Sequence, residues 1–434
     1  HEGGNIENDD TGDVACDSYN LFERDIEMLV EMEVHFYRFS LSWSRILPDG
    51  TPSAINQAGI DYYNALIDGL LAAGIEPMVT LYHWDLPQAL QDDGGWHNED
   101  SIGHFREYSR ICFEAFGDRV KWWITFNEPW VFIWLGYGDG SHAPGLDDDP
   151  GYTPYEVAHN VIRAHAESWH LYNDEYRQEQ QGQISITLNS DWKFPLDAEN
   201  PDDVAAAERA LQFSLGWYAH PIFIDGDYPE IMKTYVAFKS EQQGLDETRL
   251  PEFTEEEKAR IAGTYDFFGL NHYTTQRVEH VDRYEDPHYW LDQDLDESYD
   301  PDWPETGSSW LKVVPWGLRD LLNWIRVEYN NPPLIITENG VSDRNSSMQD
   351  DHRINYYNDY INNVLKAIDL DGCDVFGYTA WSMMDNFEWA TGYAEKFGLY
   401  HVDFSVPERT RTAKASVGTY RQIIDDNGFI EPDI

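Results

Sequence analysis

The sequence predicts a single (β/α)8 barrel of the TIM type, in the α/β class, because strand-like and helix-like segments alternate from end to end. Seven short runs rich in β-branched and aromatic residues are bounded by polar, glycine or proline residues, which is typical of buried parallel strands. Longer amphipathic stretches, such as 64–73 and 355–368, separate these runs and are expected to be helices. The expected strands cover residues 36–41, 77–82, 121–126, 183–188, 266–270, 334–337 and 375–379.

The whole chain is expected to be one domain. No proline-rich linker or break in composition divides its 434 residues, and a barrel can have this length as one unit. A closed barrel needs an eighth strand, yet the polar residues 1–20 have no strand character. We therefore expect residues 1–434 to form one barrel domain from which the first strand is missing, which would leave two strand edges unpaired.

The chain is strongly acidic, with 80 Asp and Glu residues against 29 Lys and Arg residues and a net charge of −51. This charge disfavours nucleic acid and anionic membranes as partners, and no apolar run reaches membrane-spanning length. Self-repulsion on this scale destabilises a fold unless salt screens it, over a Debye length of about 3 Å at 1 M. We expect a salt-adapted, halophilic protein with an acidic surface, which neither requires nor forbids a homo-oligomer.

The three cysteines carry little functional information. Cys16, Cys112 and Cys373 lie far apart, without the spacing of a disulfide framework or a metal site. This usage suits a reducing cytoplasm, so we expect a cytoplasmic protein in which each thiol is a small buried hydrophobe. No metal-ligand cluster, phosphate loop or nucleotide motif is present in the sequence, which therefore implies no cofactor and no metal.

Two glutamates stand where expected strands stop. Glu128 follows the run at 121–126, in the sequence TFNEP, and Glu338 follows the run at 334–337, in the sequence ITENG. In a barrel, catalytic groups gather at the carboxyl ends of the strands. Either glutamate alone would more often be a surface or ion-paired residue, but two carboxyl groups at this end are what a glycosidase requires.

The chemistry of glycosidic bond cleavage assigns different tasks to two such acids. One carboxyl group protonates the leaving oxygen, and the other stabilises or traps the cationic sugar. Phe126, Pro129 and Trp130 flank Glu128 and predict partial desolvation, which would keep this acid protonated near neutral pH. Glu338 must instead remain ionised, a form that a neighbouring guanidinium would favour.

Further motifs, in order along the chain, resemble those of family 1 of the glycoside hydrolases, the retaining β-glucosidase and β-galactosidase family. They are YRFSLSWSRI at 37–46, HWDLP at 83–87, NEP at 127–129, TENG at 337–340, WSMMDNFEW at 381–389, GY at 392–393 and FGL at 397–399. The resemblance extends from residue 2 to near the C-terminus. It implies a β-glucosidase-type hydrolase that removes terminal non-reducing β-D-glycosyl residues by double displacement.

The resemblance also implies roles for individual residues near the bond that is cleaved. Glu128 would be the general acid/base and Glu338 the nucleophile, with their carboxyl groups about 5–5.5 Å apart. Arg38 and Tyr273 match positions that hold the nucleophile ionised and aligned. Asn127 matches a residue that binds the sugar 2-hydroxyl, a contact that strengthens in the transition state.

Sugar recognition needs polar groups for the rim of a pyranose and flat apolar surfaces for its C–H faces. By the same resemblance, His83 and Trp84 contact the glycone, Trp381 is the stacking platform, and Glu388 with Trp389 holds the 3-, 4- and 6-hydroxyls. The full set of expected substrate-binding residues, with Trp310 as an aglycone contact, is His83, Trp84, Asn127, Asn271, Trp381, Glu388, Trp389, Phe397 and Trp310.

The sequence departs from the family pattern at its start. The pattern has a Gln-x-Glu-Gly run at the end of the first strand, whereas this chain starts at His1-Glu2-Gly3, without the glutamine that binds the 3- and 4-hydroxyls. Weaker glycone binding and lower stability would follow. Residues 279–305 are acidic and aromatic, and are expected to be a loop that covers the active-site side.

Two other functions compete with a β-glycosidase. A 6-phospho-β-glycosidase is disfavoured because Glu388 would face the phosphate and repel it. A non-catalytic glycan-binding relative, suggested by the missing strand, would not need both acids and their supports. The sequence leaves open which glycone is preferred, since glucose, galactose and fucose differ by single hydroxyl groups.

Overall fold

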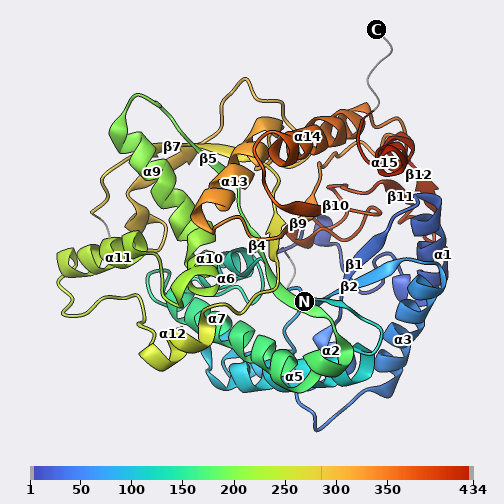
Figure 1. The fold of residues 1–434 in the computed structure, drawn as a ribbon, viewed down its shortest axis with the longest axis horizontal. Helices are drawn as coiled ribbons and strands as arrows, with labels where there is room; N and C mark the ends of the chain where they lie inside the picture. The colour runs from blue at the N-terminus through green and yellow to red at the C-terminus, as the bar shows by residue number, and fades with distance from the viewer. Residues whose placement is uncertain (1–3, 285, 430–434) are drawn as a thin grey trace.

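The computed structural model describes residues 4–284 and 286–429, and its centre is a parallel sheet of seven strands that curls into a nearly closed barrel (Figure 1). The strand order is β1-β2-β3-β4-β6-β9-β10. The bounds of these strands are β1 Phe36–Ser40, β2 Glu76–Tyr82, β3 Trp122–Asn127, β4 Gln183–Asn189, β6 Phe268–Asn271, β9 Leu334–Asn339 and β10 Val375–Ala380. All seven strands predicted from the sequence are confirmed, with ends that differ by at most two residues.

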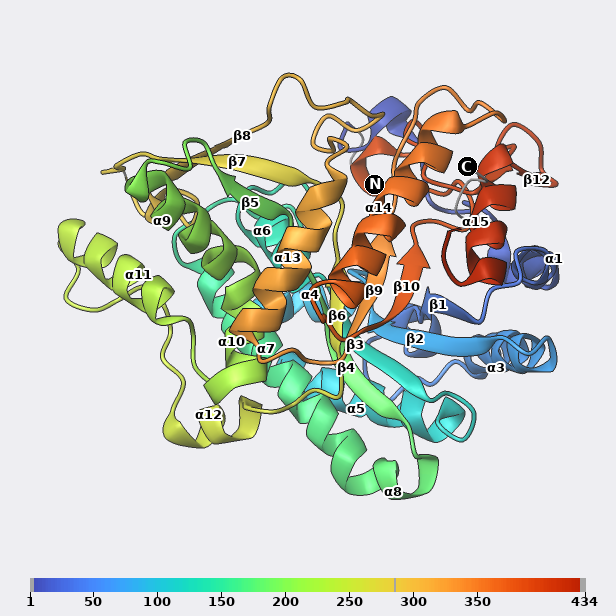
Figure 2. The ribbon, with the colours of Figure 1, turned by 45° about the horizontal axis from the view of Figure 1, so that its top comes forward.

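Helices surround the barrel on its outer face, as Figures 1 and 2 show. The predicted helices at 64–73 and 355–368 are confirmed: the first ends one residue beyond α3, and the second lies within α14. The helices are α1 Ser18–Glu31, α2 Trp43–Ile46, α3 Gln57–Ala72, α4 Gln88–Asp92, α5 Asp100–Phe116, α6 Pro129–Tyr137, α7 Thr153–Leu171, α8 Arg177–Gln180, α9 Pro201–Leu211, α10 Trp217–His220, α11 Glu230–Gln242, α12 Glu255–Ile261, α13 Pro315–Glu328, α14 Asp351–Asp369 and α15 Ala415–Asp426.

The helix α5 illustrates why the sequence folds this way. Its residues Phe105, Tyr108, Cys112, Phe113 and Phe116 recur at helical spacing and are all fully buried, so they form one apolar stripe against the barrel. All three cysteines of the chain are buried free thiols, as the sequence predicts. No helix within residues 4–284 and 286–429 is long and apolar enough to cross a membrane.

The segment 279–305 differs from the loop that the sequence predicts. The strand β8 (Leu295–Ser298) lies within this segment, and the end of β7 (Thr275–His280) reaches into it. Together with β5 (Trp192–Pro195) they form a small three-stranded sheet, in which β7 pairs with both other strands. Helix α9 packs against this sheet beside the barrel (Figure 2). Alternation is hard to recognise in the sequence because the edge strand β8 carries the adjacent charged residues Asp296 and Glu297, and the central strand β7 carries Arg277 and Glu279. A two-stranded ladder of β11 (Tyr400–Val402) and β12 (Arg411–Ala413) completes the strands.

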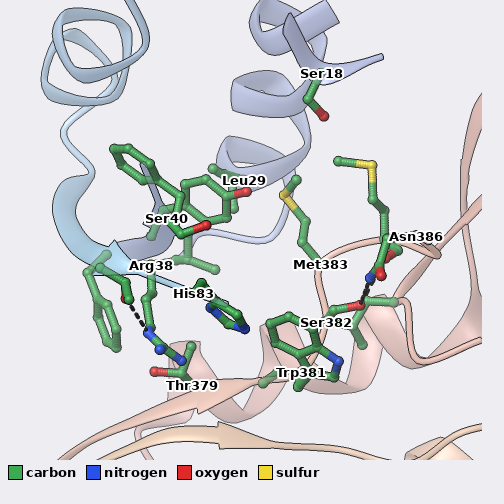
Figure 3. A pocket seen from close by; sticks show the side chains of 18 of the residues that line it. Ser18, Leu29, Arg38, Ser40, His83, Thr379, Trp381, Ser382, Met383 and Asn386 are labelled. Atoms are coloured by element: carbon green, nitrogen blue, oxygen red, sulfur yellow. Dashed lines mark hydrogen bonds between the residues drawn. The ribbon is translucent and has the colours of Figure 1, made fainter. Parts of the chain in front are cut away.

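The barrel is open between β1 and β10. In the part of the chain that the structure describes, no strand pairs with the second edge of either one. A cavity of about 570 Å³ lies here, lined by residues that include Leu29 of α1, Arg38, Trp381, Met383 and Tyr420; Figure 3 shows the first four of these. The residues His1-Glu2-Gly3, on which the predicted loss of the first strand depends, lie outside the described residues.

Candidate active site

Glu128 stands directly after β3, at the start of α6. Its backbone has φ 48° and ψ 66°, a left-handed conformation that is uncommon for a residue with a side chain. The fixed φ of Pro129 suits the first position of α6, so the chain turns sharply at Glu128 and aims its carboxyl group into the barrel mouth. The side chain is buried, and its Oε1 accepts a hydrogen bond of 2.8 Å from Asn271 Nδ2.

Glu338 lies near the end of β9 and is held by two donors. Arg38 Nη1 forms an ion pair of 2.7 Å with its Oε1, and the Tyr273 hydroxyl donates to its Oε2 over 2.8 Å. The alternation of β1 explains the position of Arg38: Tyr37 and Phe39 stack on each other on the outer face, so the residue between them points inward. The structure thus brings together the acid and the two supports predicted from separate parts of the sequence.

Two amides connect the glutamates across the barrel. Asn127 Oδ1 accepts from Arg38 Nη2 over 2.6 Å and from Asn271 Nδ2 over 3.1 Å, and Asn271 also donates to Glu128. A continuous chain of hydrogen bonds therefore runs from Glu338 through Arg38, Asn127 and Asn271 to Glu128. Each member is buried, which makes each hydrogen bond expensive to break.

Thr337 belongs to this network and was not predicted from the sequence. Its hydroxyl donates to Asn271 Oδ1 over 2.6 Å and accepts from Thr187 over 3.2 Å. The contact fixes which way the Asn271 amide faces. A threonine directly before Glu338 in the run LIITEN was the available signal, but threonine is common in strands, so the type of residue alone did not indicate a role.

The electrostatics differ between the carboxyl groups of the site. Burial, followed by the negative charge of Glu338, raises the pKa of Glu128 well above its usual value, and the hydrogen bond from Asn271 only partly opposes this shift. This is the direction that the apolar neighbours of Glu128 predict. Burial and the charge of Glu338 also raise the pKa of Glu388, to about 8. The site can therefore hold protonated acids next to an ion-paired carboxylate.

The aromatic residues predicted to bind a glycone lie beside this network. His83 and Trp389 stack with ring centroids 5.8 Å apart, and Trp84 and Trp389 are separated by 4.3 Å. His83 faces Trp381 on its other side at 6.1 Å. Burial and the charge of Arg38 lower the pKa of His83 well below its usual value, so the neutral ring accepts a hydrogen bond of 3.1 Å from the Asn127 amide.

Phe397 and Trp310 contact the same tyrosine that holds the nucleophile. Both rings approach Tyr273 edge-on, at 6.1 Å and 5.6 Å. Phe397 is buried, whereas Trp310 is 44% exposed. Trp310 therefore lies at the solvent-exposed side of Tyr273, whereas Phe397 lies in the interior.

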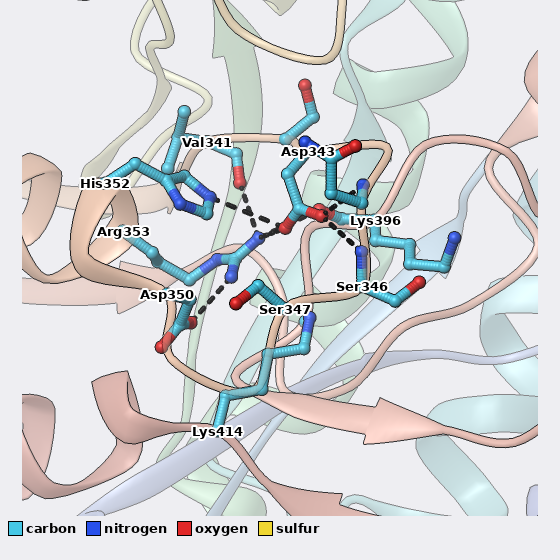
Figure 4. A network of polar contacts seen from close by, with 12 residues as sticks. Val341, Asp343, Ser346, Ser347, Asp350, His352, Arg353, Lys396 and Lys414 are labelled. Atoms are coloured by element: carbon cyan, nitrogen blue, oxygen red, sulfur yellow. Dashed lines mark hydrogen bonds and ion pairs between the residues drawn. The ribbon is translucent and has the colours of Figure 1, made fainter.

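A buried charge network holds the loop that carries the expected glycone residues, which we name the glycone loop (residues 381–399). Arg353 of α14 is fully buried and binds Asp350 over 2.6 Å, Asp343 over 2.8 Å and the Lys396 carbonyl over 2.9 Å (Figure 4). Although burial opposes it, hydrogen bonds from His352 and Arg353 lower the pKa of Asp343. The network joins the segment after β9 to the glycone loop, so the nucleophile and the sugar contacts form one rigid unit.

The chemistry of the site is that of acids and bases. Within the described ranges 4–284 and 286–429, no group of three or more His, Cys, Asp or Glu side chains could hold a metal ion. Two carboxyl groups in contrasting environments, a guanidinium and a phenol converge on one space lined by tryptophans. Such a set can protonate a leaving oxygen on one side of a sugar ring and attack its anomeric carbon from the other.

The comparisons with known proteins agree with this geometry. The family model described as glycosyl hydrolase family 1 matches residues 1–429. The chain is 54% identical over 429 residues to a lactase/phlorizin hydrolase of Homo sapiens, covering 98% of this chain but 22% of that protein. It is 47% identical over 432 residues to a cytosolic β-glucosidase of Homo sapiens, covering 99% of this chain and 92% of that protein.

A solved structure is also similar over nearly the whole chain. It is a mutant of the rice β-glucosidase Os3BGlu6 in a covalent complex with Glc. Its TM-score to this chain is 0.92 at 42% sequence identity, with 97% of this chain and 91% of that chain covered. Because this chain spans only about a fifth of the length of the lactase/phlorizin hydrolases, 22%, the likeness to them applies to one part of those proteins.

Proposed function

Because the chain belongs to glycosyl hydrolase family 1, we propose that it is a retaining β-glycosidase of the β-glucosidase type. The observation that carries the proposal is the hydrogen-bonded chain from Glu338 to Glu128, which holds one carboxylate against Arg38 and positions a second acid whose pKa is raised by burial and by the charge of Glu338. The covalent complex of the rice relative with Glc supports a mechanism through a glycosyl-enzyme.

In the first step, Glu338 attacks the anomeric carbon from the α face while Glu128 transfers its proton to the glycosidic oxygen. The bond between that carbon and oxygen breaks, the aglycone leaves as an alcohol, and Glu338 becomes a glycosyl ester. The negative charge of Glu338 is then lost, which lowers the pKa of Glu128 because that charge was one cause of its rise.

In the second step, Glu128 acts as a base. It takes a proton from a water molecule, whose oxygen attacks the anomeric carbon, and the ester bond to Glu338 breaks. The sugar leaves with its original β configuration, and both glutamates return to their starting protonation states. The fall in the pKa of Glu128 during the first step is what allows one residue to serve as acid and then as base.

The proposed glycone site uses the aromatic cluster and the glycone loop. Trp381 stacks on the sugar, Asn127 binds the 2-hydroxyl, and Glu388 with Trp389 holds the remaining rim hydroxyls, with His83 and Trp84 completing the pocket. We propose β-D-glucosides as substrates, with β-D-galactosides and β-D-fucosides as further ones. A 6-phosphoglycoside is disfavoured because its dianion would meet Glu388 in the field of a chain of net charge −51.

The test is hydrolysis of p-nitrophenyl β-D-glucoside by the chain and by Glu338→Ala, with and without azide. We expect turnover by the chain, none by the variant, and recovery of the variant with azide to give the α-glucosyl azide. The α product matters because azide would enter the space left by the nucleophile. Absence of turnover by the folded chain would favour a phosphorylated substrate or a glycan-binding function.

We further propose a salt-adapted protein that works in the cytoplasm. The net charge of −51 supports salt dependence, and the three buried free thiols together with the cytosolic β-glucosidase relatives support the compartment. Melting measured against KCl concentration tests the first claim. The melting temperature is expected to rise towards molar KCl, and an unchanged or lower value would refute salt adaptation.

A further inference from the structure

The backbone that carries Tyr273 is held by two successive carbonyl groups. The carbonyl of His272 accepts a hydrogen bond of 2.6 Å from Asn339 Nδ2. The next carbonyl, that of Tyr273 itself, accepts from the hydroxyls of Tyr356 over 3.1 Å and of Tyr360 over 3.2 Å. We name these three donors, Asn339, Tyr356 and Tyr360, the carbonyl clamp. Each of these contacts is to the main chain, so the clamp fixes the backbone from which the Tyr273 side chain projects.

The amide of Asn339 is oriented by residues of two other elements. Asn339 is the last residue of β9 and directly follows Glu338. Its Oδ1 accepts a hydrogen bond of 2.6 Å from the Tyr378 hydroxyl of β10, and its Nδ2 also donates to the Tyr356 hydroxyl of α14 over 2.9 Å. These contacts fix the amide with its nitrogen towards the His272 carbonyl.

Helix α14 places the two phenols of the clamp together. Tyr356 and Tyr360 are four residues apart, which brings side chains to the same face of a helix, and their rings stack with centroids 3.9 Å apart. Both are buried, and burial raises the pKa of each phenol, so both remain donors at neutral pH. A buried polar group that loses its partner is costly, so these hydrogen bonds resist movement of the Tyr273 carbonyl.

The clamp closes a ring of contacts around the nucleophile. From Glu338 the ring follows the chain to Asn339 and passes through the amide to the His272 carbonyl. It then follows the chain to Tyr273, whose hydroxyl returns to Glu338 Oε2 over 2.8 Å. His272 N–H also donates to the Glu338 carbonyl over 3.0 Å. The carboxyl group and the phenol that binds it are therefore held at a fixed separation by the backbone as well as by their own hydrogen bond.

The hydrogen bond between Tyr273 and Glu338 changes in strength during the proposed reaction. While Glu338 is a carboxylate, its charge strengthens this hydrogen bond and helps to hold the phenol in place. In the glycosyl ester that charge is gone, so the phenol loses this attraction. Negative charge returns to Glu338 as the ester breaks in the second step, and a donor that is already in place lowers the barrier to that step.

We propose that Asn339, Tyr356 and Tyr360 are positioning residues for the second step: they keep the Tyr273 phenol in place while Glu338 is esterified, so that it stabilises the departing carboxylate. The proposal rests on the glycosidase function proposed above. Loss of the clamp should therefore slow hydrolysis of the glycosyl-enzyme more than its formation. A role in the fold alone would not favour one step over the other.

The experiment separates the two steps with 2,4-dinitrophenyl β-D-glucoside. Its leaving group departs readily, so hydrolysis of the glycosyl-enzyme should limit kcat, whereas kcat/KM reports on the first step. A burst of dinitrophenolate at the start of the reaction shows that the glycosyl-enzyme accumulates. The variants are Tyr356→Phe and the double variant Tyr356→Phe with Tyr360→Phe, which lose hydroxyls and keep their rings.

Tyr356→Phe should lower kcat by about threefold and the double variant by about tenfold, which corresponds to about 1.4 kcal/mol. KM should fall in parallel, so kcat/KM should stay within about twofold of its value in the chain, and both variants should show a burst. Tyr108→Phe is the matched control, since Tyr108 of α5 is buried and its hydroxyl donates to the Leu81 carbonyl over 2.9 Å. It removes the same kind of hydrogen bond from another carbonyl, and should lower the melting temperature without changing kcat or KM.

The outcomes distinguish the two proposals. If the folded chain hydrolyses no glucoside, the glycosidase function fails and this inference fails with it. If the chain is active but the double variant keeps its kcat within about twofold, only the inference is overturned. Equal losses in kcat and kcat/KM, or the same loss of kcat in Tyr108→Phe, would also overturn it. Tyr356→Phe keeps one phenol on the Tyr273 carbonyl, so its kcat decides between these outcomes if the double variant does not fold.

Discussion

Replacement of Thr337 by valine tests whether the orientation of one amide controls the acid/base. The Thr337 hydroxyl donates to Asn271 Oδ1 over 2.6 Å, and Asn271 Nδ2 donates to Glu128 over 2.8 Å. In the described part of the chain, Asn271 Oδ1 has no other donor. Valine has the shape of threonine without the hydroxyl, so the variant would leave this buried oxygen unpaired and weaken the hold on the orientation of the amide.

The magnitude follows from the hydrogen bonds that would be lost. An unpaired buried acceptor costs about 1–3 kcal/mol. If the same energy is lost in the transition state, kcat/KM falls by roughly 5- to 150-fold, because about 1.4 kcal/mol is a factor of ten. The free energy of unfolding should fall by a comparable amount, since Thr337 and Asn271 are both fully buried.

The assay combines kinetics with a pH profile. We expect the alkaline limb of kcat/KM to move to higher pH in Thr337→Val, because the Asn271 hydrogen bond lowers the pKa of Glu128 in the intact site and its loss raises that pKa further. Thr337→Ser keeps the hydroxyl and should retain both the activity and the profile. Equal kinetics and profiles for the valine and serine variants would refute the argued role of Thr337.

Two further predictions follow from the raised pKa values of the carboxyl groups in the site. Because the pKa of Glu128 is raised, its acid form persists to higher pH, and kcat/KM should fall as the pH rises through that pKa. Glu128→Gln should abolish this alkaline fall in the pH profile, and it should retain kcat/KM on glycosides with good leaving groups. Glu388 in the folded chain keeps its proton to about pH 8, whereas the unfolded chain releases it near pH 4.5, so the protein loses stability as the pH rises through this window. Melting curves at pH 5 and pH 8 should show a smaller loss for Glu388→Gln than for the unchanged chain, and the variant should have a higher KM.

The elements that the sequence predicted well are those with a strong local signal. Buried parallel strands are continuous apolar runs, so β3 and β9 and the glutamates at their ends were found from the sequence alone. The β5-β7-β8 sheet was not predicted, because its strands carry charged residues and its pairing joins segments that are far apart.

The open side of the barrel gives Arg38 a second task besides holding the nucleophile. Among the described residues, β1 has a partner strand on one edge only, yet Arg38 reaches from it across the barrel to Glu338, Asn127 and the Thr337 carbonyl. These contacts join β1 to β9 and β3, strands with which it does not pair. The ion pair that supports catalysis is therefore also a cross-link for the strand at the open edge. Loosening of β1 would withdraw the guanidinium from Glu338, so catalysis at this site depends on how firmly that edge is held.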